Sequence, residues 1–170
     1  MNSQFLFEKL ESSEEYKKFI SENKDAYLCS GFFIIDLEKQ DNKYHFDFYV
    51  PSSKKTFSFE IENGVKLIEL ERNDGRVLEK VSMEKVFDFD GLREKFLREM
   101  VEKKISNKIQ KMIFSLQNLE NSDFLIGTIF LSGLALLKVN FDISNNKITD
   151  FEKSSFFDMM KIVKKDKNGK

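Results

Sequence analysis

The chain has few of the residues on which most catalytic and metal sites depend. Its 170 residues include one cysteine, Cys29, one histidine, His45, one proline and no tryptophan. A single cysteine cannot form an intramolecular disulfide, and no CxxC, HxH or HExxH pattern is present to bind zinc. The sequence therefore predicts no metal site and no cofactor, and it favours a reducing compartment.

Glycine-rich phosphate loops are also missing. The seven glycines form neither GxGxxG nor GxxxxGK[ST], which argues against the common nucleotide-dependent chemistries. Nucleophilic catalysis would have to use Cys29 with His45, the one base of its kind in the chain. Cys29 lies in an apolar run and His45 at the outward position of an alternating segment, so structural roles are favoured for both. We therefore expect a protein that is not an enzyme.

Segments that would take the chain to or through a membrane are not evident. Met1 to Phe5 has neither the basic leader nor the apolar stretch of a signal peptide. Residues 124–137 carry no charge, but fourteen residues fall short of the roughly 20 that a spanning helix needs. The sequence thus predicts a cytoplasmic protein with no membrane partner.

Charge of one sign is not in excess, since 28 basic residues oppose 29 acidic ones. A nucleic-acid partner is therefore disfavoured, although basic side chains gather between Arg93 and Lys111. A solvated face is the favoured reading of this segment. The candidate binding residues within it are Lys103, Lys104, Lys108 and Lys111.

The first half of the chain reads as helix followed by strands. Ser12 and Glu15 form a capping-box pattern for a helix to about Asn23, with a short helix before it. An apolar run from 26 to 37 predicts a central strand covered on both faces. Alternating segments at 44–50 and 57–61 and a segment at 65–70, separated by turns, predict an antiparallel meander, and residues 77–81 offer one further strand.

The second half begins with a long apolar periodicity. Spacing near 3.6 from Leu92 to Leu119 predicts a helix of about 28 residues, roughly 42 Å long. A break near residues 104–107 and an overhang used in dimer contact are both open. The second apolar run then predicts a strand, bulged at Gly133, that ends in the alternation of residues 139–143. A strand from Lys147 to Phe151 and a short helix capped by Ser154 or Ser155 complete the chain.

These elements predict one α+β domain, residues 1–163, with a curved antiparallel sheet packed on the long helix and a disordered basic tail at 164–170. Two half-repeats, 1–87 and 88–163, are possible. Aligning residues 49–60 with 141–152 gives four identities, which leaves duplication and chance equally open.

The closing segment from Lys138 to Ile148, KVNFDISNNKI, resembles the last hairpin of the PepSY and cystatin-like group, although Asn146 stands where PepSY proteins usually have glycine. Residues 26–33, AYLCSGFF, are similar in texture to uncharacterised proteins of small-genome archaea. The PepSY resemblance implies a binding or inhibitory module without catalytic residues.

Three functional hypotheses follow. The first is a non-enzymatic module that binds a protein or peptide, or a second copy of itself, through a sheet edge or the concave sheet face. The second is a small-ligand or enzymatic pocket in a cystatin-like cup, lined by Tyr27, His45, Tyr49 and an aspartate. The third is weak nucleic-acid binding by the basic helix.

Overall fold

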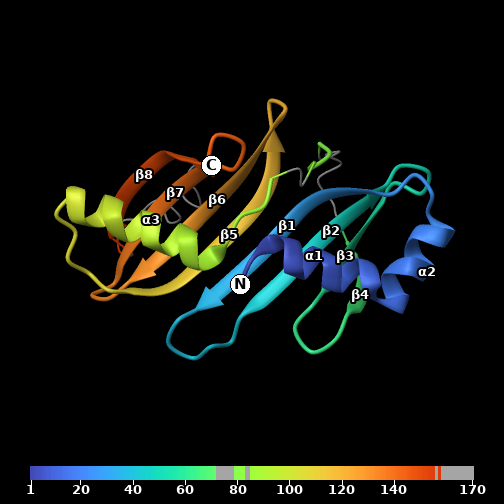
Figure 1. The fold of residues 1–170 in the computed structure, drawn as a ribbon, viewed down its shortest axis with the longest axis horizontal. Helices are drawn as coiled ribbons and strands as arrows, with labels where there is room; N and C mark the ends of the chain where they lie inside the picture. Colours follow the sequence, from blue (N-terminus) through green and yellow to red (C-terminus); the bar gives the residue numbers. More distant parts are fainter. Residues whose placement is uncertain (72–78, 83–84, 156, 158–170) are drawn as a thin grey trace, which may run out of the picture.

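The computed structural model describes residues 1–71, 79–82, 85–155 and 157. In these ranges three helices accompany one eight-stranded antiparallel sheet (Figure 1), which confirms the predicted α+β class with a curved antiparallel sheet. The helices are α1 (Ser3–Ser12), α2 (Glu14–Glu22) and α3 (Phe89–Glu102). The strands are β1 (Tyr27–Asp36), β2 (Lys43–Val50), β3 (Lys55–Glu60), β4 (Lys66–Leu70), β5 (Ile109–Leu119), β6 (Ser122–Leu131), β7 (Ala135–Asp142) and β8 (Lys147–Ser155).

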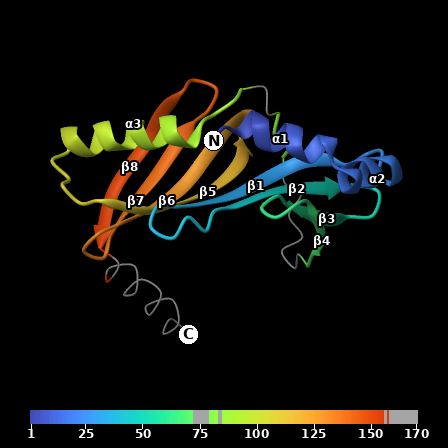
Figure 2. The same cartoon turned by 60° about the horizontal axis from the view of Figure 1, so that its bottom comes forward.

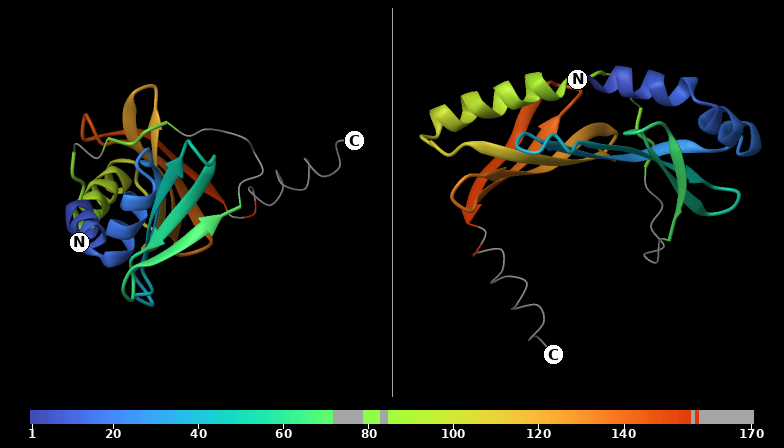
Figure 3. Two further views of the ribbon diagram at one scale, coloured as in Figure 1. Left: turned by 90° about the vertical axis from the view of Figure 1, so that its right-hand side faces the viewer. Right: turned by 90° about the horizontal axis from the view of Figure 1, so that it is seen from below.

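The strand order is β4-β3-β2-β1-β5-β6-β7-β8, so each half of the chain supplies one half of the sheet. The halves meet where β1 pairs with β5, from Gly31 opposite Leu116 to Asp36 opposite Lys111. All three helices lie on the same face of the sheet, with α1 and α2 over the first half and α3 over the second (Figures 2 and 3). We call the opposite surface the helix-free face.

Each helix begins at a polar residue whose side chain accepts a free backbone N–H. Asn2 accepts from Phe5 N at 2.8 Å, and Asp88 accepts from Gly91 N at 2.8 Å. Ser13 accepts from Tyr16 N at 3.2 Å, so the cap of α2 is Ser13 and the predicted Ser12 was wrong by one residue.

The long helix predicted from residue 92 to 119 was also wrong. α3 ends at Glu102, Lys104 adopts a left-handed φ of 55°, and residues from Ile109 onward form β5. Met112, Phe114 and Leu116 are completely buried while the residues between them are half-buried, which is the two-residue period of a strand. Apolar residues on both strand faces had produced an accidental helical spacing.

The second apolar run is a hairpin of two strands, where a single bulged strand was predicted. β6 ends at Leu131 and β7 starts at Ala135, joined by a turn in which Gly133 has φ 73° and Leu134 has φ 57°. Glycine adopts this left-handed conformation without a steric cost. Gly133 is therefore a turn residue, and β7 with β8 forms the hairpin that follows it.

The two halves share an element order, helix and then four antiparallel strands, which keeps a duplication as a hypothesis. The alignment of residues 49–60 with 141–152 matches the β2–β3 hairpin to the β7–β8 hairpin. In the common order, β2–β3 corresponds instead to β6–β7. The four identities therefore do not occupy equivalent positions.

The core fills the space between the helices and the sheet. Leu6, Leu10 and Phe19 pack from the first two helices, and Phe96 and Met100 pack from α3, against alternate residues of the strands. Predictions for the strand at 77–81 and for the final helix and tail fall mainly outside the described residues. Within the described part, residues 79–81 belong to no strand, and β8 extends to Ser155.

Candidate functional site

The helix-free face carries an apolar strip across its central strands. Phe32 of β1 lies opposite Ser115 of β5, which lies opposite Ile126 of β6. In the neighbouring row Ile34 lies opposite Ile113. Phe32 is 38% exposed and the three isoleucines are half-buried, so these side chains form a surface and not a core. We call these four residues the central strip.

A groove of about 320 Å³ lies on this strip. Its floor holds Phe32, Ile113 and Ile126, and its polar rim comes chiefly from the second half of the sheet. The lining residues are Phe32, Ile113, Ser115, Ile126, Gly127, Thr128, Lys138, Asn140 and Asp150. A concave apolar surface with a few polar groups at its rim suits recognition of another molecule.

Two charges at the rim are available to a partner. Lys138 on β7 lies opposite Glu152, and Asp150 on β8 lies opposite Asn140. Within the described ranges, no ion pair is formed by either Lys138 or Asp150. Each charge is exposed and thus stays hydrated until a complementary group displaces the water.

The other flank of the strip is aromatic and polar. The rings of Tyr27 and Tyr49 lie 5.7 Å apart, and Ser30 Oγ donates to Asp47 at 2.7 Å. His45 Nε2 lies 3.4 Å from Glu62 Oε1 and 3.9 Å from Glu60 Oε1, with the ring 6.1 Å from that of Phe32. His45 therefore lies beside Phe32, and none of Tyr27, His45 and Tyr49 lines the groove.

Cys29 and His45 have different surroundings. Cys29 is buried at the β-bulge of β1, and its Sγ donates to the carbonyl of Asp47 at 3.3 Å. His45 is held near the two glutamates of the β3 side. The structural roles of both residues stay a prediction.

The basic candidates are spread over a helix end, a loop and a strand. Lys103 caps α3, 3.5 Å from Glu99 and 5.7 Å from the ring centre of Phe151. Lys111 binds Asp36 at 2.8 Å. Lys104 and Lys108 lie in the exposed loop between α3 and β5. The nucleic-acid hypothesis assumed one continuous basic helix over residues 92–119. The structure has no such helix, because α3 ends at Glu102 and β5 begins at Ile109.

Three aspartates of the sheet, Asp36, Asp47 and Asp142, each have separate partners. Lys111, with the backbone amides of Lys39 and Glu38, lowers the pKa of Asp36 to about 2. Asp47 accepts from Ser30, and the Asn145 side chain lowers the pKa of Asp142. No group of three metal-ligating side chains occurs in the residues that the structure describes.

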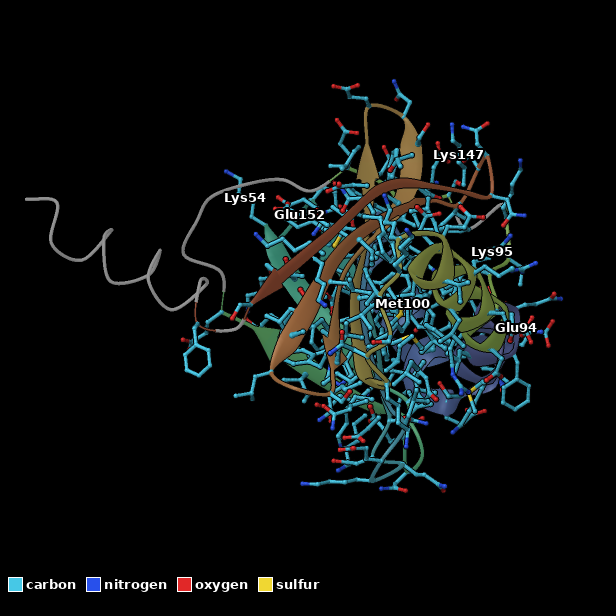
Figure 4. The ribbon with its side chains drawn as sticks, turned by 90° about the vertical axis from the view of Figure 1, so that its left-hand side faces the viewer. Lys54, Glu94, Lys95, Met100, Lys147 and Glu152 are labelled. Atoms are coloured by element: carbon cyan, nitrogen blue, oxygen red, sulfur yellow. The ribbon has the colours of Figure 1, made fainter. Side chains whose placement is uncertain are left out.

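The two edges of the sheet differ in their side chains. β4 is five residues long, with Leu67 40% and Ile68 41% exposed. β8 is nine residues long and carries Lys147, Asp150, Glu152 and Lys153, with a bulge in its pairing to β7. Figure 4 shows Lys147 and Glu152 on this edge, and Met100 directed from α3 towards the sheet. Charges and bulges protect an edge strand from further pairing.

Comparisons with known proteins give a fold and no function. No protein-family model and no curated protein matches the chain. A solved structure of a "putative lipoprotein" from Clostridium difficile 630 superposes with a TM-score of 0.54 at 16% identity, covering 83% of this chain and 91% of that one. Such a likeness concerns the fold alone. Among the described residues, no helix has the length and apolar character to cross a bilayer.

Sequence reasoning located β1 but predicted β5 as helix and β6 with β7 as a single strand, and it missed the groove. The apolar runs were expected to be covered on both faces, whereas the central strip remains partly exposed on the helix-free face. The available signal was the alternation in β6, where Ile126 and Phe130 are half-buried and Leu125 and Ile129 are completely buried. Alternation distinguishes the two faces, but it does not reveal which face the helices cover.

Proposed function

We propose that this chain is a non-enzymatic binding module that docks a protein partner on the helix-free face of its sheet. The observation that carries the proposal is the central strip with its groove. An apolar centre surrounded by polar groups is the usual composition of a protein interface. The groove accepts an apolar side chain of the partner over Phe32, Ile113 and Ile126, while Lys138 and Asp150 pair with its charges.

Geometry supports protein docking over catalysis. The groove brings one ammonium and one carboxylate together with amide and hydroxyl groups, and none of these lining residues is a histidine or cysteine. Covalent catalysis usually relies on a nucleophile beside a base, most often a serine or cysteine beside a histidine. Rim charges of this kind set the orientation and rate of association instead.

The test uses a matched pair of substitutions in the full chain. Phe32 and Leu97 are both 38% exposed, one on the central strip and the other on α3. Phe32→Asp is expected to abolish recovery of a stoichiometric partner from native lysate, and Leu97→Asp to preserve it. Thermal unfolding of both variants establishes that the fold is retained.

A second variant tests the rim charge, and its thermal unfolding is compared with that of the parent chain because Lys138 lies opposite Glu152. Lys138→Glu changes an exposed rim charge, and it is expected to slow association and to alter its salt dependence. If both Phe32→Asp and Lys138→Glu retain the partner as the parent chain does, docking takes place elsewhere. If gentle isolation repeatedly yields no stoichiometric partner, the binding proposal itself fails.

We propose that the protein resides in the cytoplasm. Its single cysteine cannot form an intramolecular disulfide, which supports a reducing compartment. The name of the structural neighbour, a lipoprotein, supports a membrane surface instead. Cell fractionation separates these alternatives. Recovery of the native protein with membranes after a high-salt wash would contradict the cytoplasmic proposal.

A further inference from the structure

A second cavity, of about 560 Å³, lies between the start of α3 and the turn that joins β7 to β8. Its apolar lining includes the exposed Val86 and the core residues Leu92, Phe141 and Ile143. Cavities that hold small molecules measure about 300–1,000 Å³. The second cavity shares no lining residue with the groove on the central strip, so the two can bind independently.

Gly91 leaves open space on the α3 side of the second cavity. A Cβ built on Gly91 would come within 4 Å of one other side chain among the described residues, that of Asp88, at 3.5 Å. Gly91 is a helical residue, so a larger side chain fits its backbone. The first turn of α3 can therefore be approached closely by a ligand, and the same space can be filled by substitution.

Two lysines line the second cavity. Lys85 lies in the segment before α3, and its Nζ donates to the backbone carbonyl of Ser144. Lys95 is half-buried on α3, and Figure 4 shows it on the side of the helix that faces Lys147 of β8. Neither Lys85 nor Lys95 forms an ion pair within the ranges that the structure describes. Both positive charges are therefore available to a ligand.

The carboxylates close to these lysines have other partners. Asp88, which lines the cavity, accepts from Gly91 N at 2.8 Å through Oδ2, and its Oδ1 lies 3.3 Å from the Met1 ammonium. Asp142 interacts with Lys85 through its charge, and both of its oxygens accept from Asn145, at 2.9 and 2.7 Å. The lining therefore has an excess of positive charge, which favours an anionic ligand.

We propose that the second cavity binds a small organic anion that carries a carboxylate or a phosphate on an apolar body. The anionic group lies beside Lys85 and Lys95, and each ammonium offers it charge-assisted hydrogen bonds. The apolar body covers Val86 and the accessible edges of Leu92 and Phe141. This binding does not require the docking of a protein on the helix-free face.

The first test compares three probes by titration into the full chain, followed through the NMR signals of the Gly91 and Asn146 backbone amides. 1-Naphthoate has an anionic group on an apolar body, 1-naphthylmethylammonium has the same body with a positive charge, and inorganic phosphate has no apolar body. 1-Naphthoate is expected to shift both signals saturably and to bind at least about tenfold more tightly than either other probe. No saturable shift up to about 10 mM, or equal binding of another probe, overturns the proposal.

Lys95→Glu and Arg93→Glu form a matched pair, because they reverse the same charge on α3 two residues apart. Arg93 is exposed and does not line the second cavity. Lys95→Glu is expected to weaken 1-naphthoate binding by at least about tenfold, because a carboxylate replaces a contacting ammonium. Arg93→Glu is expected to change it by less than about twofold, because solvent and salt screen the longer distance. Equal losses would show a general field effect and overturn the proposal.

A variant that fills the second cavity separates lost space from lost fold. Gly91→Met puts a flexible apolar side chain into the open space and removes a glycine from α3. 1-Naphthoate binding is therefore expected to be lost, while the melting temperature stays the same or rises. Gly91→Ala, which adds one methyl group, is the control and is expected to retain most of the binding. Undiminished binding by a folded Gly91→Met chain places the probe elsewhere and overturns the proposal.

The two binding proposals can fail separately. Phe32→Asp changes the central strip, so it is expected to bind 1-naphthoate as the parent chain does, and Gly91→Met is expected to retain the protein partner. Loss of 1-naphthoate binding in a folded Phe32→Asp chain would contradict the assignment of the anion to the second cavity.

Discussion

The two halves of the sheet reach the same arrangement with different side chains. In the first half the core under α1 and α2 is aromatic, and Phe59 alone has three rings within 5.7 Å, those of Tyr16, Phe19 and Phe48. In the second half the core under α3 is largely aliphatic, with one stacked pair, Phe96 and Phe114, at 5.9 Å. The same arrangement of helices over strands is therefore compatible with an aromatic core and with an aliphatic one.

The two edge strands of the sheet also differ. The first half ends in the short strand β4, on which Leu67 and Ile68 are exposed, and the second half ends in the longer strand β8. Both edges carry charged side chains, two of five residues on β4 and four of nine on β8, and charges on an edge strand resist the addition of a further strand. A common topology therefore ends in two edges that differ in length and in exposed large apolar residues.

The largest effect is expected from removing a ring in the aromatic half. Phe59 and Phe96 are both completely buried, and replacing either with leucine keeps an apolar side chain in place. Phe59→Leu loses two more ring contacts than Phe96→Leu, each worth about 0.5–1.5 kcal/mol, so its loss of unfolding free energy should be larger by about 1–3 kcal/mol. Urea denaturation of the two variants measures this difference. Equal losses would show that ring contacts do not distinguish the halves.

Replacing a glycine beneath a core ring should cost more stability in the second half than in the first, which reverses the order expected for the ring substitutions. A Cβ at Gly127 would lie 2.4 Å from the ring of Phe114 and 2.9 Å from the carbonyl of Ile113. At Gly31 the closest atom is the ring tip of Phe33, at 2.8 Å, with backbone no nearer than 3.3 Å. Gly127→Ala should therefore cost about 1–3 kcal/mol and Gly31→Ala less. A reversed order in thermal unfolding would mean that Phe114 moves more freely than its packing implies.

The sequence allows the first half to be predicted better than the second. Tyr44, Phe46 and Phe48 alternate with more polar residues, so β2 follows from its period alone. In β5 both faces carry apolar residues, such as Met112 and Ile113. The segment therefore fits a helical period as well as a strand period. The turn at Ser132 to Leu134 contains one glycine and a leucine at positive φ, which is a weak turn signal.

The candidate site could be predicted only in part, for a physical reason. Phe32 and Ile126 are far apart in sequence and are brought together by the pairing of β1 with β5 and of β5 with β6. Strand order is a property of the whole chain, which no local period encodes. The groove was therefore not identified from the sequence, although the apolar residues that form it were evident.

The seam between the halves should be sensitive to acid. Asp36 of β1 binds Lys111 of β5 at 2.8 Å, and its pKa of about 2 lies below the value near 3.9 of an unfolded chain. The ionised form is thus favoured by folding, so its stabilisation is complete above about pH 5 and is lost as the pH falls towards 2. Asp36→Asn should lower the melting temperature at pH 7 and flatten its dependence between pH 5 and 2. Asp41→Asn, which changes the carboxylate of an exposed pair with Lys43, is the control and should do neither.

The smallest effects are expected at the helix caps, where the halves can again be compared. Ser13 accepts the Tyr16 amide at 3.2 Å, whereas Asp88 accepts the Gly91 amide at 2.8 Å and lies 3.3 Å from the Met1 ammonium. Removing a cap costs about 1 kcal/mol, and a charged acceptor at a helix start interacts with the helix dipole as well. Asp88→Ala should therefore destabilise the chain more than Ser13→Ala, and Asp88→Asn should recover most of the loss because it keeps the cap. If Asp88→Asn is as unstable as Asp88→Ala, the ion pair between Asp88 and the Met1 ammonium contributes more to stability than the helix cap. The Met1 ammonium would then hold the start of α3 in place through its charge.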